Sequence, residues 1–465
     1  MKRFAILACM TFVAGCTMLG PNYKRPEARL PSVFPASPLA ADVSVPAEWW
    51  KLYSDPTLDE LVASTRANNA DIRIAAAQVE EAEAVLRQAR AALFPEVSGG
   101  LARTRNRVGT LTEPLPPATA PLTRSDTRLF ATTNFELDFW GRLERTGEAA
   151  RAGLLGSRFS RDVVMLTLSS ITAQTYFGLR SLDAQLAVLA QTIRARRDSL
   201  ALARARLDAG LASELDLHQA QAALSDALVQ SRDAERQRAL LERQLGQLTG
   251  RPDLKLAPAD LFALPVPPTP PAGLPSTLLD RRPDIRASEQ SMIAANAQIG
   301  VAKAALFPSI SLTGTLGTQS AAFADLLTTG SGIWSIGYAL ALPIFDAGRR
   351  QAAVEQAEAR QRQALGAYQR SIETGFREVS DGLVNLEQTT ASEADLMERL
   401  TAARNALDLS NQRYEAGYSP YLEVLDAQRT ANEAELAFVR NRQARLAFSV
   451  DLMKALGGGW TKGAD

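Results

Sequence analysis

The stretch RAALFPEVSG, Arg90 to Gly99, is repeated almost unchanged as KAALFPSISL, Lys303 to Leu312. Each stretch predicts the end of a helix, because the proline of Phe-Pro cannot continue the helical hydrogen-bond ladder. The same offset of 213 residues relates Asp71-Ile72-Arg73 to Asp284-Ile285-Arg286. The sequence therefore predicts that one structural unit is present twice.

The offset between the two copies changes once along the chain. Gly141-Arg142 matches Gly348-Arg349 at an offset of 207, so the first copy holds six extra residues before Gly141. We assign these residues to the proline-rich stretch Thr110 to Asp126, because prolines mark loops and loops tolerate insertions. The two copies then cover nearly the whole chain.

Each copy predicts a helix, a pair of strands and a long helical hairpin. Apolar and polar residues alternate in the strand segments, as Leu129, Ala131 and Thr133 do against Thr132 and Asn134, which is typical of a sheet with one apolar face. The long stretches that follow Arg142 and Arg349 lack proline and are rich in helix-forming residues. Each breaks at an Ala-Gly pair and then resumes as a helix, which predicts a C-cap. The expected organisation is a signal peptide at 1–15, an N-terminal linker at 16–56, repeat 1 at 57–250 with strands in 94–139, a proline-rich linker at 251–283, repeat 2 at 284–459 with strands in 307–343, and a tail at 460–465.

The N-terminus resembles a secretion signal. Lys2 and Arg3 precede the apolar run Phe4 to Ala14, which is too short to cross a bilayer. VAGC, Val13 to Cys16, resembles the lipobox of bacterial lipoproteins, in which the cysteine becomes the acylated first residue. Since Thr17 rather than aspartate follows, the sorting pattern indicates the outer membrane, with the protein lipid-anchored through Cys16.

Composition and motifs argue against catalysis. The 51 basic and 51 acidic residues balance, so no nucleic-acid-binding surface is indicated. Cleavage before Cys16 leaves one cysteine, which is lipidated, and this excludes a disulfide, a thiolate zinc site and a catalytic thiol within the chain. His218, the only histidine, fits a solvated or inter-helix position. We expect no enzyme activity, no metal site and no cofactor beyond the covalent lipid.

Each chain supplies four predicted strands, which are too few to close a β-barrel. Strands with one apolar face and aromatic residues near their ends, such as Phe139, Trp140, Trp334 and Tyr338, are typical of outer-membrane barrels. An open edge in lipid leaves backbone groups unpaired, so several chains must combine. Two chains give eight strands, which side chains nearly fill, whereas three give twelve and leave an aqueous channel. We therefore expect a trimer.

The chain resembles the outer-membrane factors of tripartite efflux pumps, the TolC/OprM group, in their NodT-like lipoprotein branch. The resemblance covers essentially the whole mature sequence and rests on several motifs. They are GPNYKRP after Cys16, AEWWKLYSDPTLDELV (Ala47 to Val62), LPSTLLDRRPDIRASE (Leu274 to Glu289), FDAGRR (Phe345 to Arg350) and RYEAGYSPYLEVLDAQR (Arg413 to Arg429). It implies an α+β membrane protein, a trimeric 12-stranded β-barrel on a periplasmic α-helical barrel. The function implied is an exit duct, with a periplasmic adapter and an inner-membrane pump, often of the resistance-nodulation-division type, as partners.

The resemblance also implies where function lies. Leu422 and Asp426 match the family's periplasmic constriction, with Tyr414 and Arg429 among the gate-linking contacts. Three Asp426 carboxylates near a common axis would repel one another and favour cations. The alternative is an ordinary solvated helix residue, although the first copy has Gln219 at the equivalent position, so the repeat itself does not demand a carboxylate.

Two further groups of residues are candidates. The turns at the Ala-Gly pairs are candidates for adapter docking, with helix capping as the simpler interpretation; they are Ala209, Gly210, Ala416 and Gly417. Glu136 and Asp138, near the end of a strand, should face the lumen.

Two other functional classes fit parts of the sequence. A lipid-anchored periplasmic scaffold without a pore would pack its strands on its own helices. A trimeric adhesin would need one uninterrupted coiled-coil pattern, whereas this sequence folds back twice.

Overall fold

The structure, a computed structural model, describes residues 18–27, 31, 45–109, 121–267, 269 and 278–458. The expected signal peptide, Cys16, part of the proline-rich linker and the tail at 460–465 lie outside the described residues. The chain forms two compact units. Unit 1 comprises residues 1–26, 78–157 and 288–368, and unit 2 comprises residues 27–77, 158–287 and 369–465.

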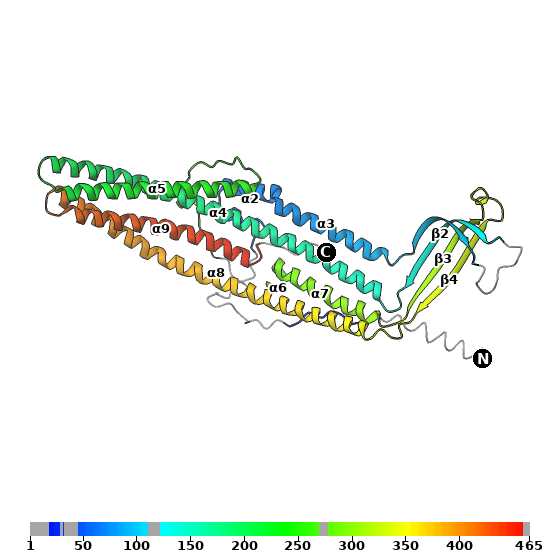
Figure 1. Ribbon diagram of the computed structural model, residues 1–465. Helices are drawn as coiled ribbons and strands as arrows, with labels where there is room; N and C mark the ends of the chain where they lie inside the picture. Colours follow the sequence, from blue (N-terminus) through cyan, green and yellow to red (C-terminus); the bar gives the residue numbers. More distant parts are fainter. Residues whose placement is uncertain are drawn as a thin grey trace. The chain divides into compact units, whose positions relative to one another are not determined.

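The two halves of the chain contain the same elements in the same order (Figure 1). The first half contains α3 (Ala70–Ala91), β1 (Glu96–Arg107), β2 (Thr123–Leu137), α4 (Arg142–Asp208) and α5 (Glu214–Thr249). The second contains α7 (Pro283–Ala304), β3 (Ser309–Ser320), β4 (Gly332–Ala341), α8 (Arg349–Glu415) and α9 (Tyr421–Ala455). Helices α4 and α8 both have 67 residues, and α3 and α7 both have 22. The predicted internal repeat is therefore present in the structure.

The helices that precede the strands end slightly earlier than predicted. Helix α3 ends at Ala91, before the Phe94-Pro95 pair that marks its predicted end, because the next residues form a tighter turn in which the Phe94 N–H donates to the Ala91 carbonyl at 3.0 Å. The second copy repeats this turn, with Phe307 N–H on the Ala304 carbonyl at 3.1 Å. Among the described helices, none combines the length and apolar character that crossing a membrane requires.

Unit 1 contains a four-stranded antiparallel sheet in the order β1-β2-β3-β4. The register sets Leu101 opposite Leu129, and Leu316 opposite both Ala131 and Trp334. Directly opposed residues share a face, so the pairing gathers the apolar side chains on one face. This face carries Val97, Leu101, Leu129, Phe135, Leu312, Leu316, Trp334, Ile336, Tyr338 and Leu340.

The apolar face of the sheet is open. Trp334 is 75% exposed and Ile336 85%. The other face is polar, and on it the hydroxyls of Ser98 and Thr132 share a cross-strand hydrogen bond of 2.9 Å. The scaffold interpretation requires the apolar face to be packed on the chain's own helices, which these exposures contradict.

The segment from Met18 to Pro26, expected to be a linker, is packed within unit 1. Arg145 on α4 is 2% exposed and donates to the Leu19 carbonyl at 3.1 Å and to the Asn22 side chain at 2.7 Å. Glu289 on α7 accepts hydrogen bonds from Arg25 at 2.6 and 2.8 Å. A side chain at Gly300 would meet the Leu19 carbonyl at 2.7 Å, so α7 needs a glycine there.

Residues 45–68 form structure that the sequence analysis did not anticipate. In unit 2, a short 3₁₀ helix, η1 (Trp49–Tyr53), precedes α2 (Pro56–Asn68). Asp55 fixes the start of α2 by accepting a hydrogen bond from the Thr57 N–H at 2.8 Å. Tyr53 is fully buried and its hydroxyl lies 2.6 Å from that of Ser449 on α9. Residues 45–56, which were predicted to be linker, are therefore part of the core of unit 2, and the rest of α2 lies within the predicted repeat 1.

The first part of the inter-repeat linker is also fixed, by buried charges in unit 2. Asp183 on α4 accepts from Arg180 at 2.8 Å and from Arg238 on α5 at 2.6 Å. The two guanidinium groups in turn donate to the carbonyls of Ala257 and Leu256, each at 2.7 Å. Two short helices, η2 (Leu261–Ala263) and α6 (Leu278–Arg281), follow.

Replacement of Asp183 should strongly destabilise unit 2. Asp183→Ala leaves two partly or fully buried guanidinium groups without their carboxylate, a change that costs about 3–5 kcal/mol. Asp233→Ala is the matched control, because its partner Arg236 is exposed and such pairs contribute less than about 1 kcal/mol. Thermal unfolding followed by circular dichroism should show a large decrease in melting temperature for Asp183→Ala only. Equal decreases in the two variants would contradict this role of Asp183.

Candidate functional site

The two Ala-Gly turns have the same backbone geometry. Gly210 and Gly417 have φ of 72° and 80°, a left-handed conformation that glycine adopts without strain. At the first turn the Gly210 N–H donates to Leu207 at 2.9 Å and the Leu211 N–H to Arg206 at 2.7 Å. The second turn repeats both bonds, so each long helix ends in a Schellman motif. Ala209 and Ala416 are the last residues before each glycine.

The return helices begin differently in the two hairpins. Ser213 and Asp216 form a reciprocal capping box at the start of α5, with bonds of 3.2 Å. Helix α9 begins after Pro420 without a side-chain cap. There, Arg413 at the end of α8 pairs with Glu423 in the first turn of α9 at 3.1 Å. An ion pair thus links the two helices of the second hairpin.

The ends of the two hairpins pack against each other within unit 2. Arg206 of the first hairpin donates to the Glu415 carbonyl at 2.9 Å, and its guanidinium lies 4.4 Å from the centre of the Tyr414 ring. The Tyr414 and Tyr421 rings lie 5.5 Å apart. They belong to a buried cluster with Ala203, Ala220 and Val424. Among the described residues the buried Tyr414 hydroxyl has no hydrogen-bond partner, so this tyrosine contributes packing.

Three of the four predicted gate residues share an exposed face of α9. Leu422 is 61% exposed, and Asp426 follows one turn later. Arg429 lies between two carboxylates, at 2.8 Å from Asp426 and 2.9 Å from Glu433. Hydrogen bonds with Asp426 and Glu433 raise the pKa of Arg429. Each chain thus presents a short row of alternating charge on this helix.

Tyr414, the fourth predicted gate residue, does not belong to this exposed face. It lies in the buried cluster at the hairpin ends. Its position makes it a packing residue that holds α8, α9 and the end of α4 together.

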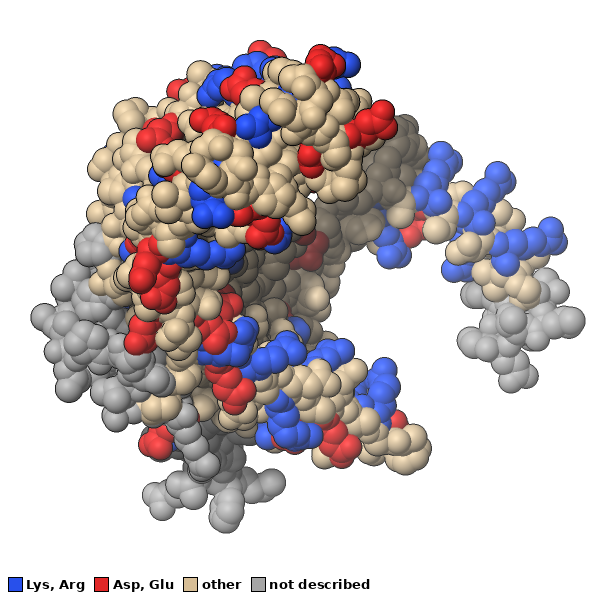
Figure 2. Space-filling view, turned by 90° about the vertical axis from the view of Figure 1, so that its left-hand side faces the viewer, with Lys and Arg blue, Asp and Glu red and all other residues tan. Residues whose placement is uncertain are grey.

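The turns expose apolar side chains that the sequence analysis did not single out. Leu211 and Tyr418, each directly after the capping glycine, are 77% and 80% exposed. In a Schellman motif the residue at this position commonly packs back on its own helix. The sequence shows only that an apolar residue follows each capping glycine, and it does not show that the side chain of this residue is exposed. Figure 2, which looks toward the ends of the helical hairpins, shows acidic and basic side chains interspersed on their surface.

Glu136 and Asp138 lie in unit 1 and have different roles. Glu136 is on the polar face of β2 and binds Arg142 through two hydrogen bonds, of 2.9 and 2.6 Å. Strand β2 ends at Leu137, so Asp138 is not part of the strand. Its carboxylate accepts a hydrogen bond from the Glu144 N–H at 2.8 Å, which satisfies a free donor in the first turn of α4. The structure therefore gives Asp138 a helix-capping role.

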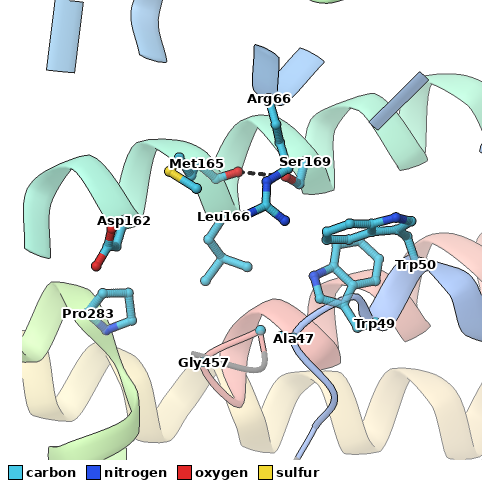
Figure 3. A pocket seen from close by; sticks show the side chains of 11 residues that line it. Ala47, Trp49, Trp50, Arg66, Asp162, Met165, Leu166, Ser169, Pro283 and Gly457 are labelled. Carbon is cyan, nitrogen blue, oxygen red and sulfur yellow. Dashed lines mark hydrogen bonds between the residues drawn. The ribbon is translucent and has the colours of Figure 1, made fainter. Parts of the chain in front are cut away.

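A cavity of about 220 Å³ lies in unit 2 beside η1. Figure 3 shows Asp162 at one end and Trp49 and Trp50 at the other. The Arg66 guanidinium lies 5.1 Å from the centre of the Trp50 ring, and the Ser169 hydroxyl donates to the Met165 carbonyl at 2.7 Å. These polar groups already have partners, and no nucleophile and base face each other in the cavity.

The described residues contain no group of three His, Cys, Asp or Glu side chains able to hold a metal ion. His218 is an exposed residue in the second turn of α5. The features that distinguish this chain are therefore the open apolar sheet and the paired hairpin ends.

Comparison with known proteins identifies relatives of the whole chain. The profile of a family described as "Outer membrane efflux protein" matches residues 61–251 and 274–458, one segment for each repeat. The toluene efflux pump outer membrane protein TtgF of Pseudomonas putida is 36% identical over 483 residues, which cover 98% of this chain and 97% of the relative. The cation efflux system protein CusC of Escherichia coli is 34% identical over 458 residues, 96% of both chains.

Solved structures agree with these relatives. The outer-membrane channel OprN superposes with a TM-score of 0.88 at 26% identity, over 96% of this chain and 100% of that chain. The open state of the Neisseria gonorrhoeae MtrE outer membrane channel gives a TM-score of 0.85 at 29% identity, over 95% and 98%.

Tyr414 should be required for the order of the hairpin ends. Tyr414→Ala removes a buried ring, a change that costs about 3–5 kcal/mol for a packed aromatic residue, so Leu207 to Ser213 and Glu415 to Tyr421 should exchange their amide hydrogens faster. Tyr418→Ala removes an exposed ring from the same turn and is the control. Tyr414→Phe should exchange like the wild type, because the hydroxyl has no described partner. Equal exchange in both alanine variants would contradict this role.

Proposed function

This chain belongs to the outer membrane efflux protein family, and we propose that three copies of it form the complete exit duct of a tripartite efflux system. The protein acts in the outer membrane and provides the path by which exported compounds leave the cell. The family is one of transport channels rather than enzymes. The energy for export must therefore come from a partner.

The open edges of the sheet carry the proposal of a trimer. Among the described residues of one chain, the backbone groups on the outer sides of β1 and β4 have no neighbouring strand, yet the apolar face of the same sheet is exposed and suited to lipid. Unpaired backbone groups in hydrocarbon cost several kcal/mol each, so β1 of one chain must pair with β4 of the next. Three sheets give a twelve-stranded barrel wide enough for a channel.

The ends of the helical hairpins support a gate and a docking surface. In a trimer, α9 would bring three copies of Leu422, Asp426 and Arg429 toward a common axis. The carboxylates would favour cations, and each Arg429 would hold its own Asp426 in place. The exposed Leu211 and Tyr418 beside Gly210 and Gly417 offer apolar contacts to a periplasmic adapter, which would connect the duct to an inner-membrane pump of the resistance-nodulation-division type.

A lipid anchor at Cys16 is consistent with the path of the residues that follow it. The Leu19 N–H donates to the Trp140 carbonyl at 3.1 Å, and Met18 packs against Gly141. Both contacts lie where β2 gives way to α4. An acyl chain on Cys16, only two residues before Met18, would therefore start close to the periplasmic end of the barrel.

Sequence similarity to these relatives does not identify the compounds that pass through this duct. The two relatives described above differ by only two percentage points in identity to this chain, yet one is named for toluene and the other for cations. Selection of the substrate is therefore assigned to the pump and not to this duct.

The trimer and the gate can be tested together on purified, acylated protein. Native mass spectrometry should give three chains per particle, and planar-bilayer recordings should give small, cation-favouring currents. Asp426→Ala should raise the current severalfold and abolish the cation preference, because it removes both size and charge at the constriction. Asp426→Asn keeps the size and should abolish the preference with little change in current.

Two results would contradict parts of the proposal, and a third would change the explanation of the gate. A monomer without conductance after verified membrane insertion would contradict the trimeric duct. A conducting trimer unaffected by both substitutions would keep the duct and exclude Asp426 from its gate. Equal currents in Asp426→Ala and Asp426→Asn would attribute the effect to charge alone.

A further inference from the structure

Three arginines form a column on β1. Arg103, Arg105 and Arg107 occupy alternate positions and are all exposed. Since side chains alternate between the faces of a strand, the column lies on the same face as Val97 and Leu101. It therefore extends the apolar face of the sheet toward the turn that connects β1 to β2.

The column lacks nearby negative charge within the sheet. The register sets its members opposite neutral residues of β2, namely Thr127, Ser125 and Thr123. Among the described residues, none of the three arginines takes part in an ion pair. The opposite face differs, since there Arg128 pairs with Asp126 at 2.6 Å. The column is thus an unneutralised basic strip with a row of hydroxyl side chains beside it.

The position of the column corresponds to the boundary of a membrane. On β2 the apolar face runs from Leu129 to Leu137, nine residues whose eight steps span about 27 Å along the strand. A strand tilt of about 40° reduces this to about 20 Å, close to the apolar band of outer-membrane barrels. Arg103 lies only two residues beyond Leu101, at the level of lipid headgroups.

We propose that Arg103, Arg105 and Arg107 bind the phosphate groups of a glycolipid in the outer leaflet of the outer membrane. The inference rests on the proposed function, which turns the apolar face toward lipid and the β1–β2 turn toward the exterior. Guanidinium groups bind phosphate through paired hydrogen bonds and shed water easily. The acyl chains of the same lipid would lie on Val97, Leu101 and Leu129.

A membrane lipid fits this strip better than a free phosphate ion does. The guanidinium groups repeat every two residues, about 7 Å apart, on an extended line that stands directly above apolar side chains. A small ion would use at most one or two of them and none of the apolar surface. A phosphorylated amphiphile uses both, with the charged part on the column and the chains below.

Pairing of chains would leave the strip accessible. Strand β1 is an edge strand in one chain and would pair with β4 of its neighbour through backbone groups in the plane of the sheet. Side chains stand roughly perpendicular to that plane. The column would therefore remain on the outer surface of the closed barrel, once per chain.

The test compares two double variants with the same change in charge. Arg103→Gln with Arg105→Gln alters the column, whereas Arg124→Gln with Arg128→Gln alters the same hairpin on its other face. Purified trimers are mixed in detergent with bis-phosphorylated lipid A or with lipid A freed of its phosphates, and bound lipid is counted by native mass spectrometry. The column variant should bind phosphorylated lipid A about tenfold more weakly, and the control variant like the wild type.

Other outcomes would overturn the inference. Equal binding by both double variants, or equal binding of lipid A with and without phosphates, would exclude the column as the headgroup site. Displacement of the lipid by millimolar inorganic phosphate alone would show a simple anion site. Trimer mass and bilayer conductance are measured on the same preparations, so a failure of the proposed function would appear there and a failure of the lipid site would not.

Discussion

The constraint on which the rest of this molecule depends is the hydrogen-bonding requirement of backbone groups at the edges of a sheet. The described part of a single chain supplies β1 to β4, and one edge of β1 and one edge of β4 have no neighbouring strand there. In water such edges are tolerable, but the exposed apolar face suits this sheet to lipid, where they are not. The proposed trimer would meet this requirement, and the twofold internal repeat divides the four strands of the sheet equally between the two halves of the chain.

The repeat also explains how one unit provides two different hairpin ends. Both end in the same Schellman geometry, because Gly210 and Gly417 occupy the same place in each copy. The side chains around them have diverged. The first hairpin contributes Arg206, which binds the second, while the second contributes Tyr414 and the exposed charges that include Asp426. Because the backbones are alike and the side chains differ, the first hairpin supports the second through Arg206, and the second carries the exposed charges.

Local patterns made much of the fold predictable, and long-range packing accounts for what was missed. Each of these patterns lies within a few residues. The Phe-Pro pairs predicted the helix ends, the alternation of apolar and polar residues predicted the strands, and the Ala-Gly pairs predicted the turns. The burial of Tyr53 depends on Ser449, almost four hundred residues away, so residues 45–53 looked like linker. Strand alternation placed Asp138 on β2, whereas its hydrogen bond to the Glu144 N–H makes it a cap. Likewise, the burial of Tyr414 depends on packing between the hairpins, which the motif alone does not reveal.

The chemistry that holds the hairpin ends together differs from the chemistry on their surface, and salt would distinguish the two. The rings of Tyr414 and Tyr421 and the cluster around them are buried. The pairs of Arg429 with Asp426 and Glu433 are exposed and lie within reach of screening ions. Rising ionic strength would therefore weaken the exposed ion pairs of Arg429 and leave intact the buried cluster that joins the two hairpins of one chain.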